Sequence, residues 1–232
     1  MKILPVVPVV KTLQTEVLGK IFEMAICLLY NTQFDVKYKY SMEEAQLLCD
    51  RINPLLEVFP HKIKHIAKNG NQYDFCGIED ENIKLSAKTT KKDGKVCPQV
   101  IGQPSKKKFC EFFSIDSSIS LEEIKLYIEE NVRNMLYIYF ELTFDCPIIY
   151  YNKTKNTLQL IESIKNIKWN ELVVDFSHLK KKKKWVESST ISVNGVTIGE
   201  FQVHNHRDCI KFRWAFENLL KVFAESFIII NL

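Results

Sequence analysis

The sequence predicts a mixed α/β fold, with α+β as the alternative, in which helices flank a mixed central β-sheet. Three observations predict it: an apolar stripe at helical spacing over residues 11–30, two paired strand patterns over residues 72–90, and further strand patterns separated by turns near the C-terminus. The 232 residues are 46% hydrophobic, which supports a substantial core. Because no linker or internal repeat interrupts them, we expect a single domain over residues 1–232.

Local signals place the elements of the first half of the chain. The apolar stripe of the first helix includes Leu13, and Glu16 and Glu23 lie off it. Ser41 and Glu44 form a capping box that starts a second helix. The other expected elements are a strand over residues 34–40, the second helix near 42–52 with Pro54 at its end, turns at Asn69-Gly70 and Asp93-Gly94, and a basic helix or loop over 99–113.

In the second half the strongest signal is Asn194-Gly195, which lies between two strand-like runs and predicts a hairpin. Segments rich in Tyr, Ile and Phe favour strands. The elements expected here are a helix from Ser120 to about residue 133, strands over 136–144 and 148–151, a short helix over 157–167, the hairpin strands 189–193 and 196–203, and a helix-like stretch over 212–223.

Composition narrows the classes of function. The seven cysteines are scattered without a CxxC pair, which is typical of reduced thiols in a cytoplasmic protein. No apolar run is long enough to span a bilayer, and the N-terminal segment lacks an A-x-A-like cleavage site. The net charge is only +4, but lysines concentrate at residues 84–95, 106–108 and 180–184. Such clusters favour polyanion binding, unless they reflect an AT-rich coding sequence.

The strand pair of residues 72–90 carries the candidate chemistry. Asp74 lies on its first strand, and Lys84, Ser86 and Lys88 share one face of its second strand because side chains alternate. A carboxylate that faces a lysine on the neighbouring strand can hold a hard divalent metal and a polarised water, which is the chemistry of phosphodiester hydrolysis. The alternative is a surface hairpin with ordinary polar residues.

This stretch resembles the PD-(D/E)xK nuclease motif, and its continuation CPQVIGQPSKKKF is similar to type II restriction endonucleases. The resemblance implies a restriction-endonuclease-like fold and a Mg²⁺ ion held by Asp74 and the backbone carbonyl of Ala87. It also implies that Lys88 orients or deprotonates the attacking water. Ser86 stands where the family carries its second acid. That acid could come from the first helix, through Glu16 or Glu23, for which the alternative is a solvated helix face.

Three polar segments outside the motif are candidate DNA contacts. Glutamine can pair with adenine, and lysine can reach guanine or phosphate. The first segment, directly after the motif, contains Gln99, Gln103, Lys106 and Lys107. The second is a lysine run expected to contact phosphates, with Lys181, Lys182 and Lys183. The third is expected to read bases and contains His204, Asn205, His206, Arg207 and Lys211. Solvated surface or turn chemistry is the alternative for each, and the two histidines lack an evident third metal ligand.

These observations together predict a Mg²⁺-dependent, site-specific deoxyribonuclease that resembles type II restriction endonucleases and cleaves double-stranded DNA. Because both strands must be cut, we expect a homodimer. We expect neither a membrane partner nor a nucleotide cofactor, and we assign residues from about 150 to 232 to a DNA-recognition subregion. The alternatives are a non-catalytic DNA-binding protein and a repair or recombination nuclease with little sequence preference.

Overall fold

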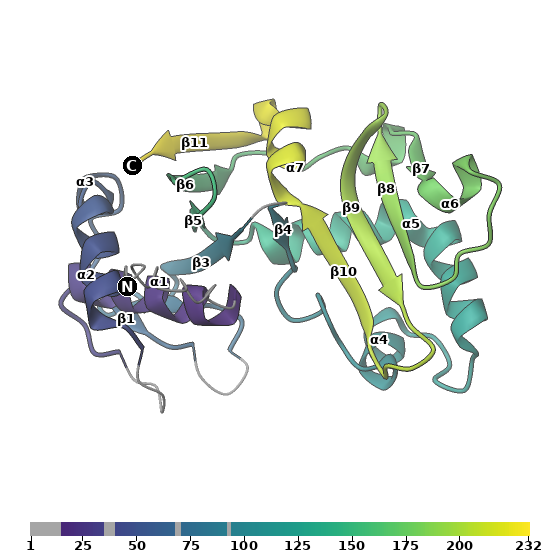
Figure 1. The fold of residues 1–232 in the computed structure, drawn as a ribbon, viewed down its shortest axis with the longest axis horizontal. Coiled ribbons are helices and arrows are strands. Elements are labelled where there is room, and N and C mark those ends of the chain that lie inside the picture. Colours follow the sequence, from purple (N-terminus) through teal and green to yellow (C-terminus); the bar gives the residue numbers. More distant parts are fainter. Residues whose placement is uncertain (1–14, 35–39, 68–70, 92–93) are drawn as a thin grey trace, which may run out of the picture.

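The computed structural model describes residues 15–34, 40–67, 71–91 and 94–232 (Figure 1). Within these ranges the strands form two sheets, one with the order β1-β2-β3-β5-β6-β11 and one with the order β4-β10-β9-β8-β7. This confirms the predicted mixed α/β architecture. The expected strand over 34–40 and the turns at Asn69-Gly70 and Asp93-Gly94 lie wholly or partly outside the described residues, as does Leu13.

The first sheet is mixed, because β3 and β5 run parallel while its other neighbours run antiparallel. Helices α1, α2 and α3 pack against one of its faces. The bounds of these elements are β1 Ile63–His65, β2 Phe75–Gly77, β3 Lys84–Thr90, β5 Ile148–Asn152, β6 Thr157–Ser163, β11 Phe227–Asn231, α1 Thr15–Leu29, α2 Met42–Arg51 and α3 Leu55–Val58.

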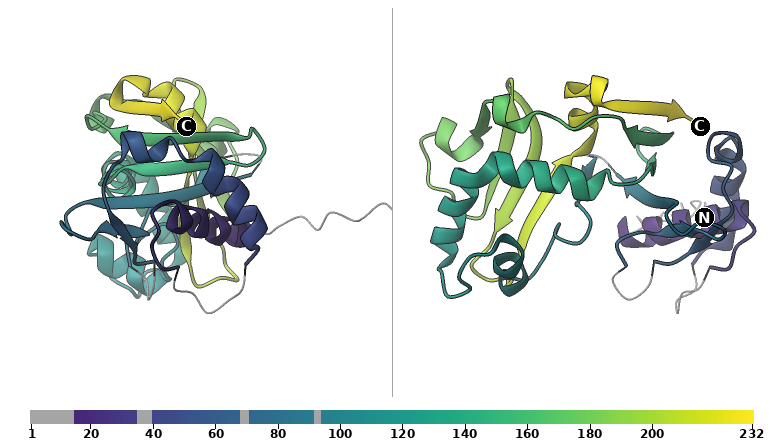
Figure 2. Two further views of the ribbon diagram at one scale, coloured as in Figure 1. Left: turned by 90° about the vertical axis from the view of Figure 1, so that its left-hand side faces the viewer. Right: turned by 180° about the vertical axis from the view of Figure 1, so that it is seen from behind.

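The second sheet is antiparallel throughout, and its apolar face packs against α5. The ring of Tyr139 on α5 stacks on Phe212 of β10 with centroids 4.4 Å apart. Seen from behind (Figure 2, right), α5 lies across the face of this sheet. The remaining bounds are β4 Lys95–Val96, β7 Val174–Phe176, β8 Ser188–Val193, β9 Val196–Val203, β10 Ile210–Ala215, α4 Lys106–Phe113, α5 Leu121–Thr143, α6 Ser177–Lys180, α7 Phe216–Val222, η1 Trp169–Glu171 and η2 Ala224–Ser226.

Two hydrophobic cores lie on opposite faces of the first sheet, and strand β5 shows how they are divided. Ile148 and Tyr150 belong to the core shared with α5 and the second sheet. Ile149 and Tyr151 belong to the core beneath α1 and α2. Every residue of β5 is therefore buried, as in sheets that are covered on both faces.

The strand expected over residues 136–144 is wrong, because α5 continues to Thr143. The aromatic and branched composition of this segment favours a strand only weakly. Its apolar residues also recur at helical spacing, and burying that stripe beside two sheets outweighs the propensity. The buried residues in this part of α5 are Val132, Met135, Leu136, Tyr139, Phe140 and Thr143.

Two further predictions are corrected in the C-terminal half. The helix expected over 157–167 is instead strand β6, which pairs with both β5 and β11 and follows a turn in which Asn156 has a φ of 57°. The helix-like stretch over 212–223 begins as the end of β10, and α7 starts only at Phe216. The hairpin at Asn194-Gly195 is confirmed, with φ of 50° and 78° at the two residues.

Candidate functional site

The structure brings Asp74 and Lys88 together at the paired strands β2 and β3. Asp74 precedes β2, and its Oδ2 accepts a hydrogen bond of 2.8 Å from the backbone N–H of Ala87. The same oxygen lies 3.6 Å from Lys88 Nζ, and about a fifth of each side chain is exposed (18% and 20%). The turn between the strands is tight, since a Cβ at Gly77 would clash with the Asp80 carbonyl oxygen. The predicted carboxylate–lysine pair is therefore present and accessible.

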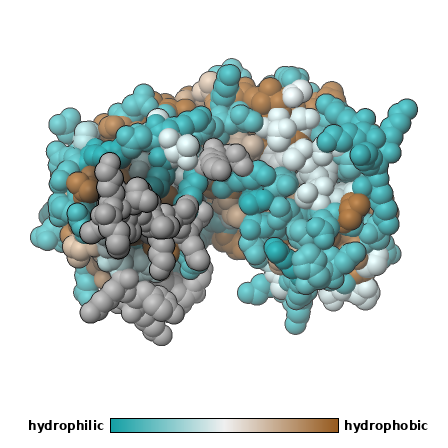
Figure 3. All heavy atoms as spheres, in the orientation of Figure 1, coloured by the Kyte–Doolittle hydropathy of each residue, from teal (hydrophilic) through white to brown (hydrophobic). Residues whose placement is uncertain are grey.

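An open cavity of about 360 Å³ lies beside this pair, where the two sheets meet. Strand β3 leads into β4, which pairs with β10 of the second sheet, so both sheets contribute to the lining. Figure 3 shows the surface hollowed between the two parts of the molecule. The lining contains Asn71, Gln72, Asp74, Lys88, Thr89, Lys95, Val96, Cys97, Pro98, Gln99 and Val100.

Ser86 and Gln99 form a buried polar pair, and Gln99 also lines the cavity. Ser86 is fully buried, and its hydroxyl accepts a hydrogen bond of 2.6 Å from Gln99 Nε2. Gln99 was expected on a basic surface segment, but only 6% of it is exposed. Its Oε1 is buried and has no hydrogen-bond partner among the described residues. The next residue, Val100, has a φ of 61°, which is strained for a branched side chain and is typical of functional sites.

The two helical glutamates differ in their environment. Glu16 is exposed, but Glu23 is buried rather than on a solvated face. Lys20 Nζ lies 2.6 Å from Glu23, and His65 Nε2 lies 3.0 Å from it. His65 is paired with Phe75, the residue after Asp74. Among the described residues, the polar partners of Glu23 are thus Lys20 and His65, and it lies in the layer beneath the candidate site.

Asp145 is a carboxylate near the site that the sequence reasoning missed. It accepts hydrogen bonds of 2.6 Å from the Tyr73 hydroxyl and 2.5 Å from Gln72 Nε2. Burial raises the pKa of the neighbouring Cys146 thiol to about 12, and the charges of Asp145, Lys88 and Asp74 also act on that thiol. Asp145 follows the long helix α5, far from Asp74 in the sequence, so no local pattern could have indicated it.

The polar face of the second sheet lies next to the cavity, because Lys95 and Val96 of β4 line it. Glu200 Oε2 accepts hydrogen bonds from Lys95 (3.0 Å) and Arg213 (2.7 Å). Burial alone would raise the pKa of Glu200, but these two bonds and their charges lower it below its usual value. Burial raises the pKa of the Cys97 thiol, against the positive charges of Lys211, Arg213 and Lys88. Positive side chains therefore extend from Lys88 on β3 to Lys211 and Arg213 on β10.

Two of the three predicted DNA-contact segments lie side by side. Backbone hydrogen bonds join Ile210 N–H to the Pro104 carbonyl (3.0 Å) and Phe212 N–H to the Gly102 carbonyl (2.9 Å). The loop that contains Gln103 therefore runs along β10, and Lys106 and Lys107 begin α4 directly after it. The predicted base-reading residues His204, Asn205, His206 and Arg207 form the turn between β9 and β10, and Lys211 lies on β10.

The lysine run lies apart from these segments. Lys181, Lys182 and Lys183 are exposed and follow α6, at the β7 edge of the second sheet, whereas β4 forms the edge beside the cavity. The flanking lysines form ion pairs on the surface, Lys180 with Asp175 at 2.8 Å and Lys184 with Glu122 at 3.4 Å. This run and the Asp74–Lys88 pair are thus at opposite edges of the second sheet.

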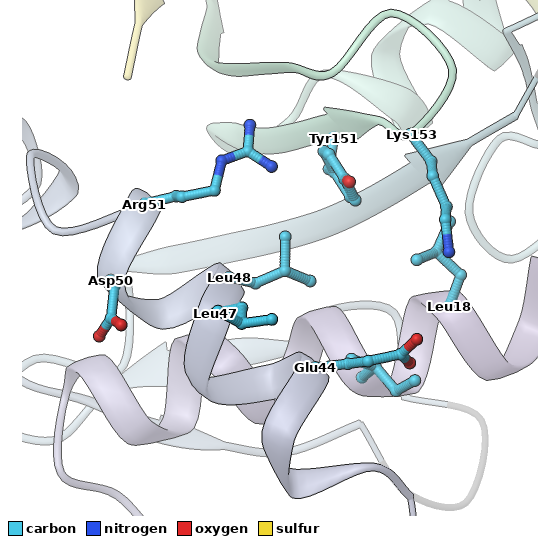
Figure 4. Close-up of a pocket in the computed structure, with 9 residues that line it drawn as sticks. Leu18, Glu44, Leu47, Leu48, Asp50, Arg51, Tyr151 and Lys153 are labelled. Atoms are coloured by element: carbon cyan, nitrogen blue, oxygen red, sulfur yellow. The ribbon is translucent and has the colours of Figure 1, made fainter.

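A second cavity, of about 470 Å³, lies over α1, α2 and the end of β5 (Figure 4). Apolar side chains form much of its lining, with charged residues around them. None of the predicted site residues lines it. The lining consists of Leu18, Ile21, Glu44, Leu47, Leu48, Asp50, Arg51, Tyr151 and Lys153. Its apolar character does not suit a phosphate backbone, so we place the candidate site at the cavity beside Asp74.

Comparison with known proteins agrees with this chemistry. Over 216 residues the chain is 46% identical to the type II restriction enzyme CviAII of Paramecium bursaria Chlorella virus 1. The chain is thus similar to a type II restriction enzyme over most of its own length. The match covers 93% of this chain and 62% of the length of that relative. No family model and no solved structure matches the chain. Among the described residues, no helix is both long and apolar enough to cross a membrane.

Proposed function

We propose that this chain is a type II restriction endonuclease that hydrolyses phosphodiester bonds of double-stranded DNA at specific sites. The observation that carries the proposal is the Asp74–Lys88 pair, 3.6 Å apart at the mouth of an open cavity, in a chain homologous to a restriction enzyme. A carboxylate directly before one strand and a lysine on the next strand support assignment to a variant PD-(D/E)xK motif, in which Ser86 would stand at the second acid. We infer that the enzyme acts as a cytoplasmic homodimer, since two strands must be cut.

The donors at this site fit Mg²⁺. The ion prefers hard oxygen ligands and retains several waters, so it needs few carboxylates. Asp74 offers a partly exposed carboxylate, and Gln99 Oε1 is a buried oxygen without a hydrogen-bond partner among the described residues. The carbonyl of Ala87 is the third proposed ligand. Bound there, Mg²⁺ would polarise the phosphodiester and lower the pKa of a water molecule.

The side chains of the chain itself have separate roles in this proposal. Lys88 Nζ accepts or orients the proton of the attacking water and offsets negative charge that develops on the phosphate. The Ala87 N–H and Lys88 fix the orientation of the Asp74 carboxylate. The Ser86–Gln99 hydrogen bond holds the Gln99 amide in place. Asp145, held by Tyr73, is our first candidate for the missing acid, and the alternatives are Glu23 and Glu16.

DNA would bind along the polar face of the second sheet. Lys211 and Arg213 on β10 supply positive charge next to Lys88, which suits contacts with phosphates. The turn from His204 to Arg207 and the loop around Gln103 are adjacent, which suits reading of base edges in one groove. In this arrangement recognition comes from the C-terminal subregion of about residues 150–232 together with residues 99–107.

A plasmid digest tests the proposal. We expect discrete fragments with Mg²⁺ and no cleavage with EDTA, and the Asp74→Asn variant is the matched control for a contaminating nuclease. A smear without bands would indicate a nuclease with little sequence preference. If the protein bound DNA but produced no cleaved DNA with any divalent metal tried, it would instead be a non-catalytic DNA-binding protein. The serine at position 86 favours this alternative.

A further inference from the structure

A group of metal-binding side chains lies outside the candidate active site, at the turn between β9 and β10. Glu187, His204 and His206 each offer one ligand atom, and these atoms all lie within 4.8 Å of one another. His204 Nδ1 is 3.3 Å from Glu187 Oε2, and His206 Nδ1 is 3.6 Å from Glu187 Oε1. The sequence shows the two histidines, but the third ligand comes from the chain just before β8.

Strand pairing positions Glu187 beside the histidines. The Val203 N–H donates a hydrogen bond of 2.8 Å to the Glu187 carbonyl, so Glu187 extends the β8–β9 ladder by one residue. His204 follows Val203 directly, and the turn brings the His206 ring to within 5.1 Å of the His204 ring, between centroids. The three side chains are therefore set by backbone hydrogen bonds and a short turn.

Two of the separations are close to those of a zinc site. When four ligands surround Zn²⁺ tetrahedrally with bonds of about 2.0–2.1 Å, neighbouring donor atoms are about 3.3–3.4 Å apart. The two nitrogen–oxygen distances, 3.3 Å to Glu187 Oε2 and 3.6 Å to Glu187 Oε1, lie near this value, and all three ligand atoms lie within 4.8 Å of one another. Both ring nitrogens of His204 are also buried, and neither has a hydrogen-bond partner among the described residues, so a metal–nitrogen bond would satisfy one of them.

We propose that Glu187, His204 and His206 bind a zinc-class transition-metal ion that ties the β9–β10 turn to the start of β8. Two imidazoles and one carboxylate select such ions over Mg²⁺, which prefers oxygen donors. The site is thus chemically distinct from the proposed Mg²⁺ site at Asp74. The ion would hold the turn that carries Asn205 and Arg207, and the fourth coordination position would remain for water or another ligand.

Cobalt binding to the full chain tests this inference. Co²⁺ replaces Zn²⁺ with the same ligands and gives visible absorption bands that report its coordination. We expect one equivalent to bind under reducing conditions, to be displaced by Zn²⁺, and to show no sulfur-to-cobalt charge-transfer band. The Glu187→Gln and His206→Ala variants should each bind cobalt at least about tenfold more weakly. Mutating a residue that only supports a metal ligand already weakens binding by about this factor, so loss of a ligand should cost at least as much.

Two controls separate this site from others. His61→Ala removes an exposed histidine elsewhere and should leave cobalt binding unchanged. Asp74→Asn should also retain it, so the result is independent of DNA cleavage and of the proposed function. Circular dichroism checks that the exposed His206 can be replaced without unfolding. Equal cobalt affinity in the wild-type and His206→Ala proteins, or a charge-transfer band that assigns the metal to cysteines, would overturn the inference.

Discussion

Gln99 donates a hydrogen bond of 2.6 Å to the hydroxyl of Ser86, at the strand position that the proposed PD-(D/E)xK motif assigns to its second acid. Both residues are buried, so a neutral pair occupies the place of a carboxylate. The amide leaves one oxygen, Gln99 Oε1, without a hydrogen-bond partner among the described residues. The proposed metal site therefore depends on Asp74 and on neutral oxygens more than a site with two acids does.

Replacing Asp74 with asparagine should reduce cleavage by a factor of about 10³ or more, since it removes the carboxylate proposed to hold the metal and several kcal/mol of charge stabilisation. DNA binding should persist, because the basic surface is unchanged. A plasmid digest and a gel-shift assay measure the two effects. If this variant cut DNA at the wild-type rate, the active site would not lie at this pair of strands.

Replacing Lys88 with alanine should reduce the cleavage rate by about 10²–10⁴, the range expected for one general acid–base group. Lys84→Ala is the matched control on the same strand. The Lys84 ammonium lies 5.5 Å from the centre of the Tyr73 ring, away from the Asp74 ion pair, so its loss should cost far less. Single-turnover rates compare the two, and equal losses would show that the register assigned to the motif is incorrect.

Asp145→Asn tests the origin of the missing acid. If Asp145 assists the metal, its loss should reduce cleavage by about 10²-fold with little change in the unfolding temperature. Glu23→Gln should instead lower the free energy of unfolding by about 1–3 kcal/mol, since Lys20 and His65 lose a charged partner in a buried place. If the Glu23→Gln protein had normal stability but did not cut DNA, the missing acid would be Glu23 on α1.

Glu200→Gln should lower the free energy of unfolding at pH 7 by about 1–3 kcal/mol, because Lys95 and Arg213 lose their shared carboxylate. The folded-state pKa of Glu200 lies below its usual value of 4.5, so its contribution is complete above that pH. It is lost as the pH falls through the folded-state pKa. Denaturant unfolding at pH 7 and in acid measures the free energies of unfolding of the wild-type and Glu200→Gln proteins, and their difference should become smaller at low pH. A difference that stays constant with pH would contradict an ionic origin.

Lys211→Ala should weaken binding to all DNA sequences and reduce the slope of log affinity against log salt by about 1, as expected for one lost phosphate contact. Lys182→Ala, in the lysine run at the β7 edge, should leave the slope unchanged, because that run lies across the second sheet from the cavity. Fluorescence anisotropy over a range of salt concentrations measures both. A reduced slope for Lys182→Ala together with an unchanged slope for Lys211→Ala would place the DNA on the β7 side of the sheet.

Local chemistry accounts for what the sequence by itself determined. The strand pair with Asp74 and Lys88 follows from alternation and a tight turn, the start of α2 from the Ser41 cap, and the last hairpin from Asn194-Gly195. In each case the interacting groups are close along the chain. Local sequence therefore predicts these features, although packing against the rest of the fold stabilises them.

Tertiary structure decided the features that depend on distant segments. Residues 136–143 are helical because their apolar stripe is buried beside two sheets, and residues 157–163 form a strand because β5 and β11 take up its hydrogen bonds. Asp145 reaches Gln72 and Tyr73, and Gln99 reaches Ser86, only once the sheets are assembled. Burial and backbone pairing between segments far apart in sequence outweigh local propensity, so the composition of such a segment alone predicts neither its conformation nor its neighbours.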